Sequence, residues 1–397
     1  MTGFILGVAA ALSTLAAGAE PPRPGAEAQV TRCIAARAEK LDFTGVVSIA
    51  RPGGTTTYLR GALGGPGSVA ISAESRFNLA SAGKMFTAIA VAQLIDAGKV
   101  GLDDPIGRHV DGLTAEAAAV TVRQLLTHSS GLGNFFTLEN LAAVQKARTV
   151  ADLLPLVAAE KPEFPPGTKF QYSNTGFLLL GRLVERVSGQ SYEQYLGAHV
   201  FGPAGMAATG LNAGPPAAQA IGMTAMPAPQ PSAPGAPARE GGHKRMRLGP
   251  GGGDHPKGPL RPAAEAALHG NPAGGSYSTA ADLQRFFAAL LGGNLTSPAM
   301  LQQLTSRQIV AAPASEGKPQ LDYGLGFGLG AFAGHLWFGH NGGAPGVNAE
   351  AAAFPDDRTT VVVLSSRDPP TASALYRELR AAVFDADALQ ACARSPK

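Results

Sequence analysis

The feature that most constrains the fold is the placement of strand-like segments, which gather near the two ends of the chain around a long helical region. Apolar and β-branched runs bounded by Gly, Pro and Asp turns predict these strands. They are residues 43–50, 55–63, 324–332, 336–338, 347–354 and 359–364. Because strands joined by short turns pair antiparallel, we expect one antiparallel sheet built from both ends of the chain.

Helices are predicted where apolar residues recur at helical intervals. The predicted helices are residues 26–40, 81–96, 122–126, 150–160, 175–187, 280–291 with Thr279 as N-cap, and 372–389. The first and last of them must cover the faces of the sheet, since a sheet buries its apolar face against another layer. The predicted class is therefore α/β, in the α+β sense, with a mostly helical domain inserted between the early and late strands.

The same pattern predicts a division into domains. We expect a discontinuous sheet domain over residues 26–80 and 271–392 and a helical domain over residues 81–211. Residues 212–270 are rich in Pro and Gly and hold little core-forming material, which is typical of an irregular insert. The basic cluster at residues 243–247 lies in this insert, and we interpret it as a solvated loop rather than a ligand site.

The N-terminus has the features of an export signal. Residues 4–17 are an unbroken apolar and small-residue run that is too short to span a bilayer, and a small-x-small site follows at residues 17–19. We therefore predict a signal peptide over residues 1–19 and a periplasmic or secreted protein. An ordinary apolar N-terminal helix is the alternative, because no Lys or Arg precedes the run. No later segment of the sequence is long and apolar enough for a membrane helix.

Composition excludes some classes of partner. The formal net charge of +3 is small for 397 residues, so a nucleic-acid partner is not expected. Two cysteines, Cys33 and Cys392, are too few for an ordinary zinc site, and no His-x-x-x-His pattern indicates a metal-dependent hydrolase. In an oxidising compartment the two thiols could form one disulfide. Two free thiols are equally compatible with the sequence.

Three short motifs carry groups suited to nucleophilic catalysis. They are Ser81-Ala82-Gly83-Lys84, Tyr172-Ser173-Asn174 and His340-Asn341-Gly342. A serine hydroxyl is a weak nucleophile and needs an adjacent base. If Ser81 opens a helix, Lys84 lies one turn on, and its amine can reach back to the hydroxyl. Lys84 can act as that base only when neutral, so burial or nearby positive charge must lower its pKa.

The other two motifs supply candidate partners for this pair. The Tyr172 phenol could carry a proton between Ser81 and the leaving group, and the Asn174 amide could donate to and accept from a substrate amide. After His340, the glycines 342 and 343 would let a substrate backbone lie close to a strand edge. The backbone N–H groups of Ser81 and Gly343 would then form an oxyanion hole.

Each motif also has a structural interpretation. The first could be a capped helix start with a solvated lysine, the second a core aromatic, and the third a turn. Each is short enough to occur by chance. Their order along the chain and their places relative to the predicted elements favour the catalytic interpretation.

Taken together, the motifs resemble those of the serine β-lactamase and penicillin-binding-protein superfamily. A Tyr-Ser-Asn second motif is similar to that of the branch with class C β-lactamases, DD-peptidases and related esterases, whereas class A enzymes have Ser-Asp-Asn. Further stretches agree with this branch. They are residues 77–80, 102–105, 125–132, 166–174, 203–206, 273–279 and 339–343. The matches run from about residue 43 to 366.

The resemblance implies an acyl-enzyme on Ser81, formed without metal or organic cofactor. It assigns catalytic roles to Ser81, Lys84 and Tyr172 and substrate-binding roles to Asn174, His340, Gly342 and Gly343. It also implies that Cys33 and Cys392 lie on packed terminal helices, which favours the disulfide.

The resemblance leaves the substrate open. It could be a D-alanyl peptide, a small ester or a β-lactam, and a low-turnover penicillin-binding or cell-wall binding protein with the same cleft is the alternative. Many β-lactamases have Lys where this chain has His340. A neutral imidazole holds an anion less well than an ammonium group, so weak β-lactamase activity is expected.

Overall fold

The computed structural model describes residues 26–64, 67–213, 218–227, 258–263, 268–315 and 319–394. The predicted signal peptide at residues 1–19 and the basic cluster at residues 243–247 lie outside these ranges. Among the described residues, no helix has the length and apolar content needed to span a bilayer.

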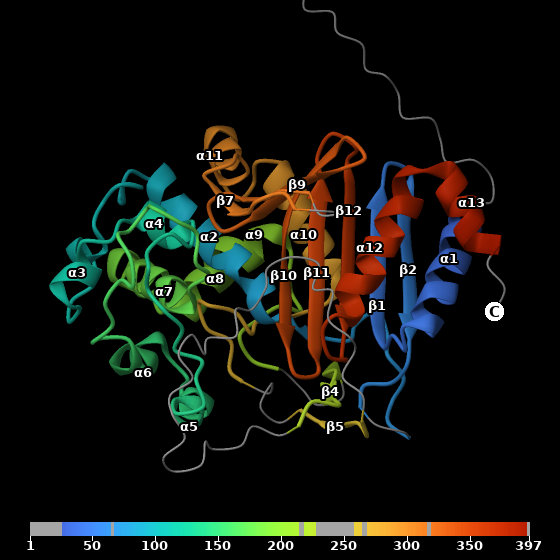
Figure 1. Ribbon diagram of the computed structural model, residues 1–397, viewed down its shortest axis with the longest axis horizontal. Coiled ribbons are helices and arrows are strands. Elements are labelled where there is room, and N and C mark those ends of the chain that lie inside the picture. Colours follow the sequence, from blue (N-terminus) through green and yellow to red (C-terminus); the bar gives the residue numbers. More distant parts are fainter. Residues whose placement is uncertain are drawn as a thin grey trace, which may run out of the picture.

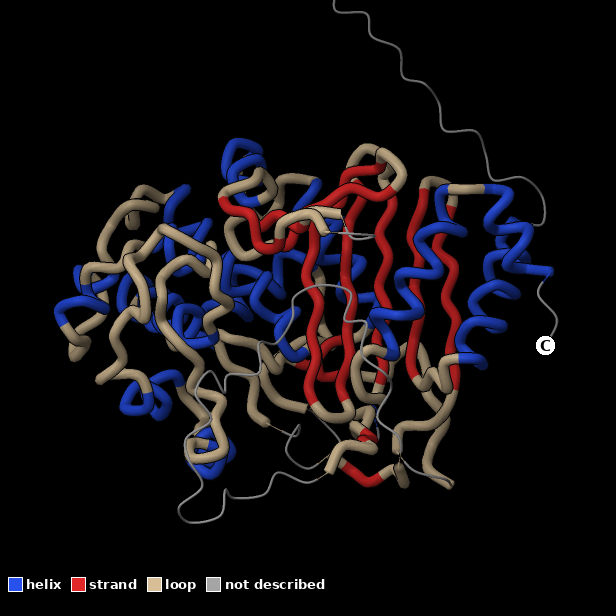
Figure 2. The backbone as a smooth tube through the Cα atoms, in the orientation of Figure 1, coloured by secondary structure: helices blue, strands red, loops and turns tan. Residues whose placement is uncertain are grey.

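One antiparallel sheet dominates the structure, as the sequence predicts, and Figure 2 shows its strands side by side with helices on both faces. The strand order is β2-β1-β12-β11-β10-β9-β8-β7. The bounds are β1 (Gly45–Arg51), β2 (Gly54–Arg60), β7 (Ile309–Ala312), β8 (Leu321–Tyr323), β9 (Gly328–Phe332), β10 (His335–Ala344), β11 (Val347–Phe354) and β12 (Thr359–Ser365). Because β1 pairs with β12, the two ends of the chain form one sheet.

Helices cover both faces of this sheet (Figure 1). Val361 and Val363 of β12 pack into the core under α1 (Ala26–Lys40), α12 (Thr371–Phe384) and α13 (Ala386–Arg394). Val362 and Leu364 point to the opposite face, into the core shared with α2 (Lys84–Asp96) and α10 (Ala280–Leu291). Successive side chains of a strand alternate between faces, so a central strand covered on both sides is apolar at consecutive positions.

The helical region lies beyond β7, at the other end of the molecule from α1 (Figure 1). Its helices are α3 (Ala115–Ala118), α4 (Val122–Leu126), α5 (Leu141–Lys146), α6 (Val150–Leu153), α7 (Asn174–Ser188), α8 (Tyr192–Leu196) and α9 (Gly202–Ala204). Helix α2 runs into this region and packs against α7. The remaining helix, α11 (Pro298–Leu304), follows α10, whose predicted N-cap Thr279 accepts a hydrogen bond from the Asp282 N–H.

Two predicted helices end earlier than the sequence indicates. The helix expected at residues 150–160 ends as α6 at Leu153 and continues only as a 3₁₀ turn, because Pro155 has no N–H to donate. The helix expected at residues 372–389 is broken at Asp385, which has extended backbone. The Asp385 carboxylate accepts hydrogen bonds from the N–H groups of Asp387 and Ala388 and so starts α13 as a new helix.

Two short two-stranded ladders lie outside the main sheet among the described residues. Strands β3 (Phe77–Asn78) and β6 (Tyr277–Ser278) pair, as do β4 (Met223–Thr224) and β5 (Arg261–Pro262). The N–H of Met223 donates to the carbonyl of Ser366, beyond the end of β12. The described parts of residues 212–270 are therefore attached to the sheet near the β10–β11 turn.

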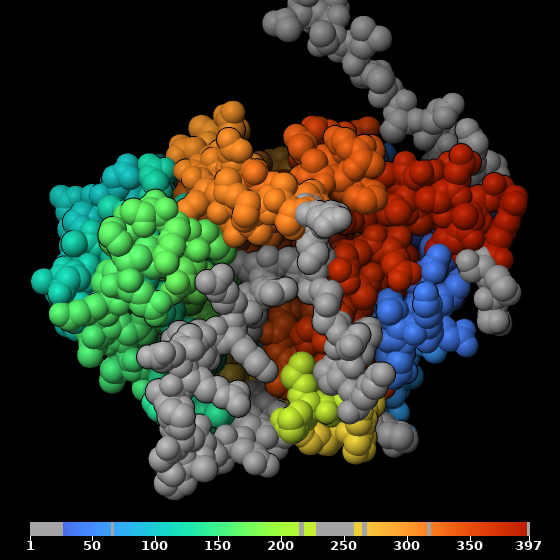
Figure 3. All heavy atoms as spheres, viewed as in Figure 1, coloured from blue at the N-terminus to red at the C-terminus, as the bar shows by residue number. Residues whose placement is uncertain are grey.

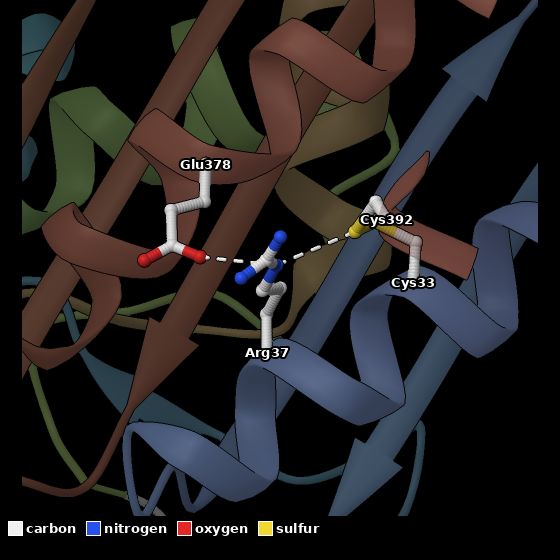
Figure 4. Close-up of a disulfide and its surroundings, with 4 residues drawn as sticks. All are labelled: Cys33, Arg37, Glu378 and Cys392. Atoms are coloured by element: carbon white, nitrogen blue, oxygen red, sulfur yellow. Dashed lines mark hydrogen bonds and ion pairs between the residues drawn. A yellow bond between two sulfur atoms is a disulfide. The ribbon is translucent and has the colours of Figure 1, made fainter. Parts of the chain in front are cut away.

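A disulfide joins Cys33 of α1 to Cys392 of α13, with 5.1 Å between the Cα atoms (Figure 4). Arg37 lies beside it, and its guanidinium donates to Cys392 Sγ at 3.4 Å and forms an ion pair with Glu378 at 3.2 Å. The pairing that the resemblance implies is therefore present, and it ties the first described helix to the last.

Candidate active site

Ser81 lies in a 3₁₀ turn, Ala80–Gly83, directly before α2 begins at Lys84. The sequence placed Ser81 in the first turn of the α-helix, and the observed start is three residues later. The turn is fixed by the Asn78 side chain, which accepts from the Ala80 N–H at 2.7 Å, while Ala80 itself has a φ of 43°. A non-glycine residue in this region of φ is strained and persists only where its surroundings hold it.

Two glycines let neighbouring segments close on this turn. A Cβ atom on Gly342 of β10 would lie 2.0 Å from the Leu79 carbonyl oxygen, and one on Gly274 would lie 2.3 Å from that of Ala80. Neither distance is compatible with a side chain. Because Gly342 has no side chain, the backbone of β10 can lie directly against the segment that carries Ser81.

Lys84 is fully buried and points at Ser81. Its Nζ lies 3.4 Å from Ser81 Oγ and 2.7 Å from Asn174 Oδ1, and it also donates to the Ala273 carbonyl. No described carboxylate forms an ion pair with it. Burial without a counter-charge disfavours the ammonium form, and it holds the pKa of Lys84 well below its usual value. The site therefore favours a neutral amine beside the hydroxyl.

Tyr172 lies against the same lysine, with 4.7 Å from Lys84 Nζ to the ring centroid. Its hydroxyl is enclosed and has no hydrogen-bond partner within bonding distance among the described residues. Burial raises the pKa of Tyr172, and the nearby Ser81 hydroxyl lowers it by a smaller amount. The phenol is therefore protonated in the ligand-free site and has a proton to donate.

His128 holds the Tyr172 segment, although no role was predicted for it beyond its place in the stretch at residues 125–132. Its carbonyl accepts from the Gln171 N–H at 2.7 Å, its Nδ1 accepts from the Ser173 N–H at 3.0 Å, and its ring lies 4.1 Å from the Tyr172 ring. Burial is the largest cause that holds the pKa of His128 well below its usual value. The ring is thus neutral, with its proton on Nε2.

Asn174 connects Lys84 to the helical region. It begins α7, after the N-cap Ser173, whose hydroxyl accepts from the Gly176 N–H at 2.9 Å. Its Oδ1 accepts from Lys84, and its Nδ2 donates to Asn134 Oδ1 at 2.8 Å. The predicted substrate contact can use the remaining N–H and the second lone pair of Oδ1, and Asn174 also positions the lysine. Asn134 is a site residue that the sequence did not reveal.

His340 lies within β10, so the alternative of a turn residue is wrong. Its Nδ1 donates to the Asn341 carbonyl, and its Nε2 accepts from the Tyr323 hydroxyl at 3.0 Å. Burial is the largest cause that lowers the pKa of His340 to about 3. His340 is therefore neutral, and both of its nitrogens are occupied by partners, of which Tyr323 was not foreseen. It supplies no positive charge for an anionic substrate group.

Beyond His340, one edge of β10 has no strand partner among the described residues. Pairing with β9 ends at Gly339, opposite Gly328, whereas pairing with β11 continues to Ala344, opposite Val347. The unpaired backbone therefore includes Gly342 and Gly343 and lies on the side of the Ser81 turn. An unpaired strand edge can pair with an extended chain. Figure 3 shows the surface of the late part of the chain, in orange and red, beside that of the helical region, in cyan and green.

Comparisons with known proteins show which family the sequence matches. A family model described as Beta-lactamase matches residues 30–386. Penicillin-binding protein 4 of Amycolatopsis lactamdurans is 35% identical over 142 residues, which cover 35% of this chain and 36% of that protein. The matched region thus spans about a third of the length of that curated relative.

Solved structures share the whole fold. A penicillin-binding protein from Bacillus halodurans matches with a TM-score of 0.72 and 26% identity, over 88% of this chain and 98% of that one. The D-amino acid amidase from Ochrobactrum anthropi SV3, complexed with L-phenylalanine amide, has a TM-score of 0.71 and 22% identity over 92% and 98% of the two chains. At 22% identity, the similarity to the amidase shows a shared fold alone. Because the family model spans most of its length, the chain belongs to the beta-lactamase family.

Proposed function

We propose that this serine hydrolase cleaves an ester or amide bond through a covalent acyl-enzyme on Ser81. The observation that carries the proposal is the buried Lys84 amine, 3.4 Å from Ser81 Oγ and without a counter-charge among the described residues. A nucleophile with a positioned base within reach is the arrangement that covalent catalysis requires.

In the acylation step, neutral Lys84 takes the Ser81 proton as Oγ attacks the substrate carbonyl. The oxygen of the tetrahedral intermediate gains negative charge, which the backbone N–H groups of Ser81 and Gly343 would stabilise. Tyr172 then donates its proton to the leaving group and regains one from protonated Lys84. The bond to the leaving group breaks, and the acyl group stays on Ser81. In deacylation, water passes a proton through Tyr172 to Lys84 as its oxygen attacks the acyl carbonyl. The bond between the acyl carbon and Ser81 Oγ then breaks, Lys84 returns the proton to Oγ, and the acid is released.

The substrate is proposed to carry a backbone-like amide or ester that pairs with the free edge of β10. The unpaired strand edge favours an extended substrate. Because His340 is neutral, it favours a substrate without an anionic group that would pair with a lysine at this position. Small esters and amides of D-amino acids fit both conditions, and the amidase and penicillin-binding neighbours agree with them. Slow turnover of β-lactams follows from the missing cation at His340.

The test compares wild type with Ser81→Ala on p-nitrophenyl esters, a D-alanyl p-nitroanilide and nitrocefin at equal enzyme concentration. We expect turnover of the ester or amide, slow or no nitrocefin hydrolysis, and a loss of several orders of magnitude in Ser81→Ala. Intact mass measurement after a fluorophosphonate should show one adduct on wild type and none on the variant. An unmodified Ser81 would contradict the proposal, whereas a stable adduct without turnover would identify a binding protein instead.

We also propose that the protein is exported. The Cys33–Cys392 disulfide supports this location, because disulfides persist in oxidising compartments. Expression of the full chain in a bacterial host, followed by fractionation and N-terminal sequencing, is the test. A mature protein starting at Glu20 is expected, and an intact N-terminus in the cytoplasm would contradict the proposal.

A further inference from the structure

A cavity lies on the face of the sheet that α12 covers. Among its lining residues are Trp337 and Asn341 of β10, Glu350 of β11, and Tyr376 of α12. The cavity has about 640 Å³ of empty space, part of it open to solvent. Side chains alternate along a strand, so Asn341 points to this face while Gly342 faces the Ser81 turn. The cavity therefore lies on the other face of β10 from Ser81, although His340 and Tyr323 also border it.

Two guanidinium groups line this cavity without a carboxylate partner. Arg377 and Arg380 are three residues apart on α12 and so lie on the same side of the helix. Neither forms an ion pair with a described residue, and the enclosed Nε of Arg380 has no hydrogen-bond acceptor among them. The neighbouring Glu378 pairs with Arg37 and does not neutralise them.

The one carboxyl group in the lining does not pair with them either. Glu350 forms no ion pair with a described residue. Burial raises its pKa to about 7, against smaller opposing effects of the Ser373 hydroxyl and the charges of Arg377 and Arg380. Two cations and at most one anion thus line the cavity, which leaves the lining with a net positive charge. The Arg380 guanidinium also lies over the Phe332 ring, 4.5 Å from its centroid.

Tyr376 adds an unpaired polar group to the same lining. Its side chain is 5% exposed, and its hydroxyl has no partner among the described residues. Buried hydroxyl groups almost always have a hydrogen-bond partner, so a partner from outside the chain is expected. Trp337 and Leu321 provide apolar surface beside these polar groups.

We propose that this cavity binds a small organic anion with an apolar body, such as an aromatic carboxylate. Arg377 and Arg380 would hold the carboxylate, because the planar guanidinium matches its two oxygens. The Tyr376 hydroxyl would donate to the same group, and Trp337 would pack against the ring. The proposed carboxylate contacts lie on the face of β10 opposite Ser81, and the proposal does not depend on the proposed function.

The experiment uses Trp337 as the reporter, because it is the single tryptophan of the chain. Benzoate is titrated into the protein while tryptophan fluorescence is recorded, and benzamide serves as the uncharged probe of equal shape. We expect a saturable change with benzoate and binding of benzamide at least about tenfold weaker, since a charge-assisted pair contributes more than a neutral one. Ser81→Ala should bind benzoate as wild type does.

Charge-removing variants test the two arginines directly. Arg377→Gln and Arg380→Gln should each weaken benzoate binding by about tenfold and leave benzamide binding unchanged. Arg186→Gln is the matched control, because Arg186 pairs with Asp111 in the helical region. Far-UV circular dichroism checks that each variant folds, and Tyr376→Phe offers a milder change with a smaller expected loss. Equal binding of the two probes, no effect of either variant, or loss of binding in Ser81→Ala would overturn the proposal.

Discussion

Burial acts in opposite directions on the two ionisable groups beside Ser81. It lowers the pKa of Lys84 and raises that of Tyr172, because in each case the charged form is the one that loses hydration. At neutral pH the amine can accept a proton and the phenol can donate one. These states divide the proton transfers between the two residues without the help of an acidic side chain.

The rate should therefore depend on the protonation of Lys84. Protonated Lys84 cannot act as a base, so kcat/KM for a neutral ester should fall as the pH drops through its lowered pKa and stay level above it. A pH–rate profile measures this limb. Lys84→Arg keeps a cation that cannot deprotonate and should lose activity by about a thousandfold or more. A flat acidic limb, or an active arginine variant, would remove Lys84 from the role of base.

Removing the Tyr172 hydroxyl should separate activity from stability. Tyr172→Phe keeps the ring against His128 and loses the proton relay, so kcat should fall by about 10²–10⁴. The lost hydroxyl has no described partner, and burying an unpaired hydroxyl costs about 1–3 kcal/mol. The variant should thus be as stable as wild type or more so in urea unfolding. A marked loss of stability would show that the hydroxyl has a structural partner.

At the scale of elements, the sequence predicts best where local pattern decides the structure. Strands β11 and β12 appear where β-branched and small apolar runs predicted them. The short edge strand β7 was missed, since its side chains are only half-buried and pairing rather than pattern holds it. Strand β10 continues past the predicted end at residue 338 through Asn341-Gly342-Gly343, because pairing with β11 outweighs the weak strand preference of glycine.

For the site, the sequence predicts which motifs supply the side chains but not all of their contacts. Lys84, Asn174 and Tyr172 lie close to one another beside Ser81. Three further contacts were not predicted: His128 behind Tyr172, Tyr323 on His340 and Asn134 on Asn174. Each depends on segments that are far apart in sequence and meet only in the folded chain.

The contact between β10 and the Ser81 turn should tolerate no side chain. Gly342→Ala would place a methyl group on the Leu79 carbonyl and push the two segments apart. We expect a loss of about 1–3 kcal/mol in unfolding free energy, as for overpacking, with a fall in kcat of at least about tenfold. Gly197→Ala is the control, because nothing lies near its added methyl group. An active, stable Gly342→Ala protein would show that β10 need not approach so closely.

At the scale of the whole molecule, one sheet takes strands from both ends of the chain, and the Cys33–Cys392 disulfide ties the helices outside it. A crosslink across such a long loop restricts the unfolded chain strongly. Cys33→Ala/Cys392→Ala should lower the unfolding free energy by about 3–5 kcal/mol, measured in guanidinium chloride. Wild type in reductant should match the variant. Equal stability of oxidised and reduced protein would mean that packing alone holds the terminal helices.

The same bond changes what a protease can do to this molecule. Because it closes a covalent ring from residue 33 to 392, a single backbone cut anywhere inside leaves both fragments attached. A nicked sample would run as one band on a non-reducing gel and as two after reduction. For the same reason, new chain ends could be introduced at another position between residues 33 and 392, and the two parts of the chain would stay covalently linked.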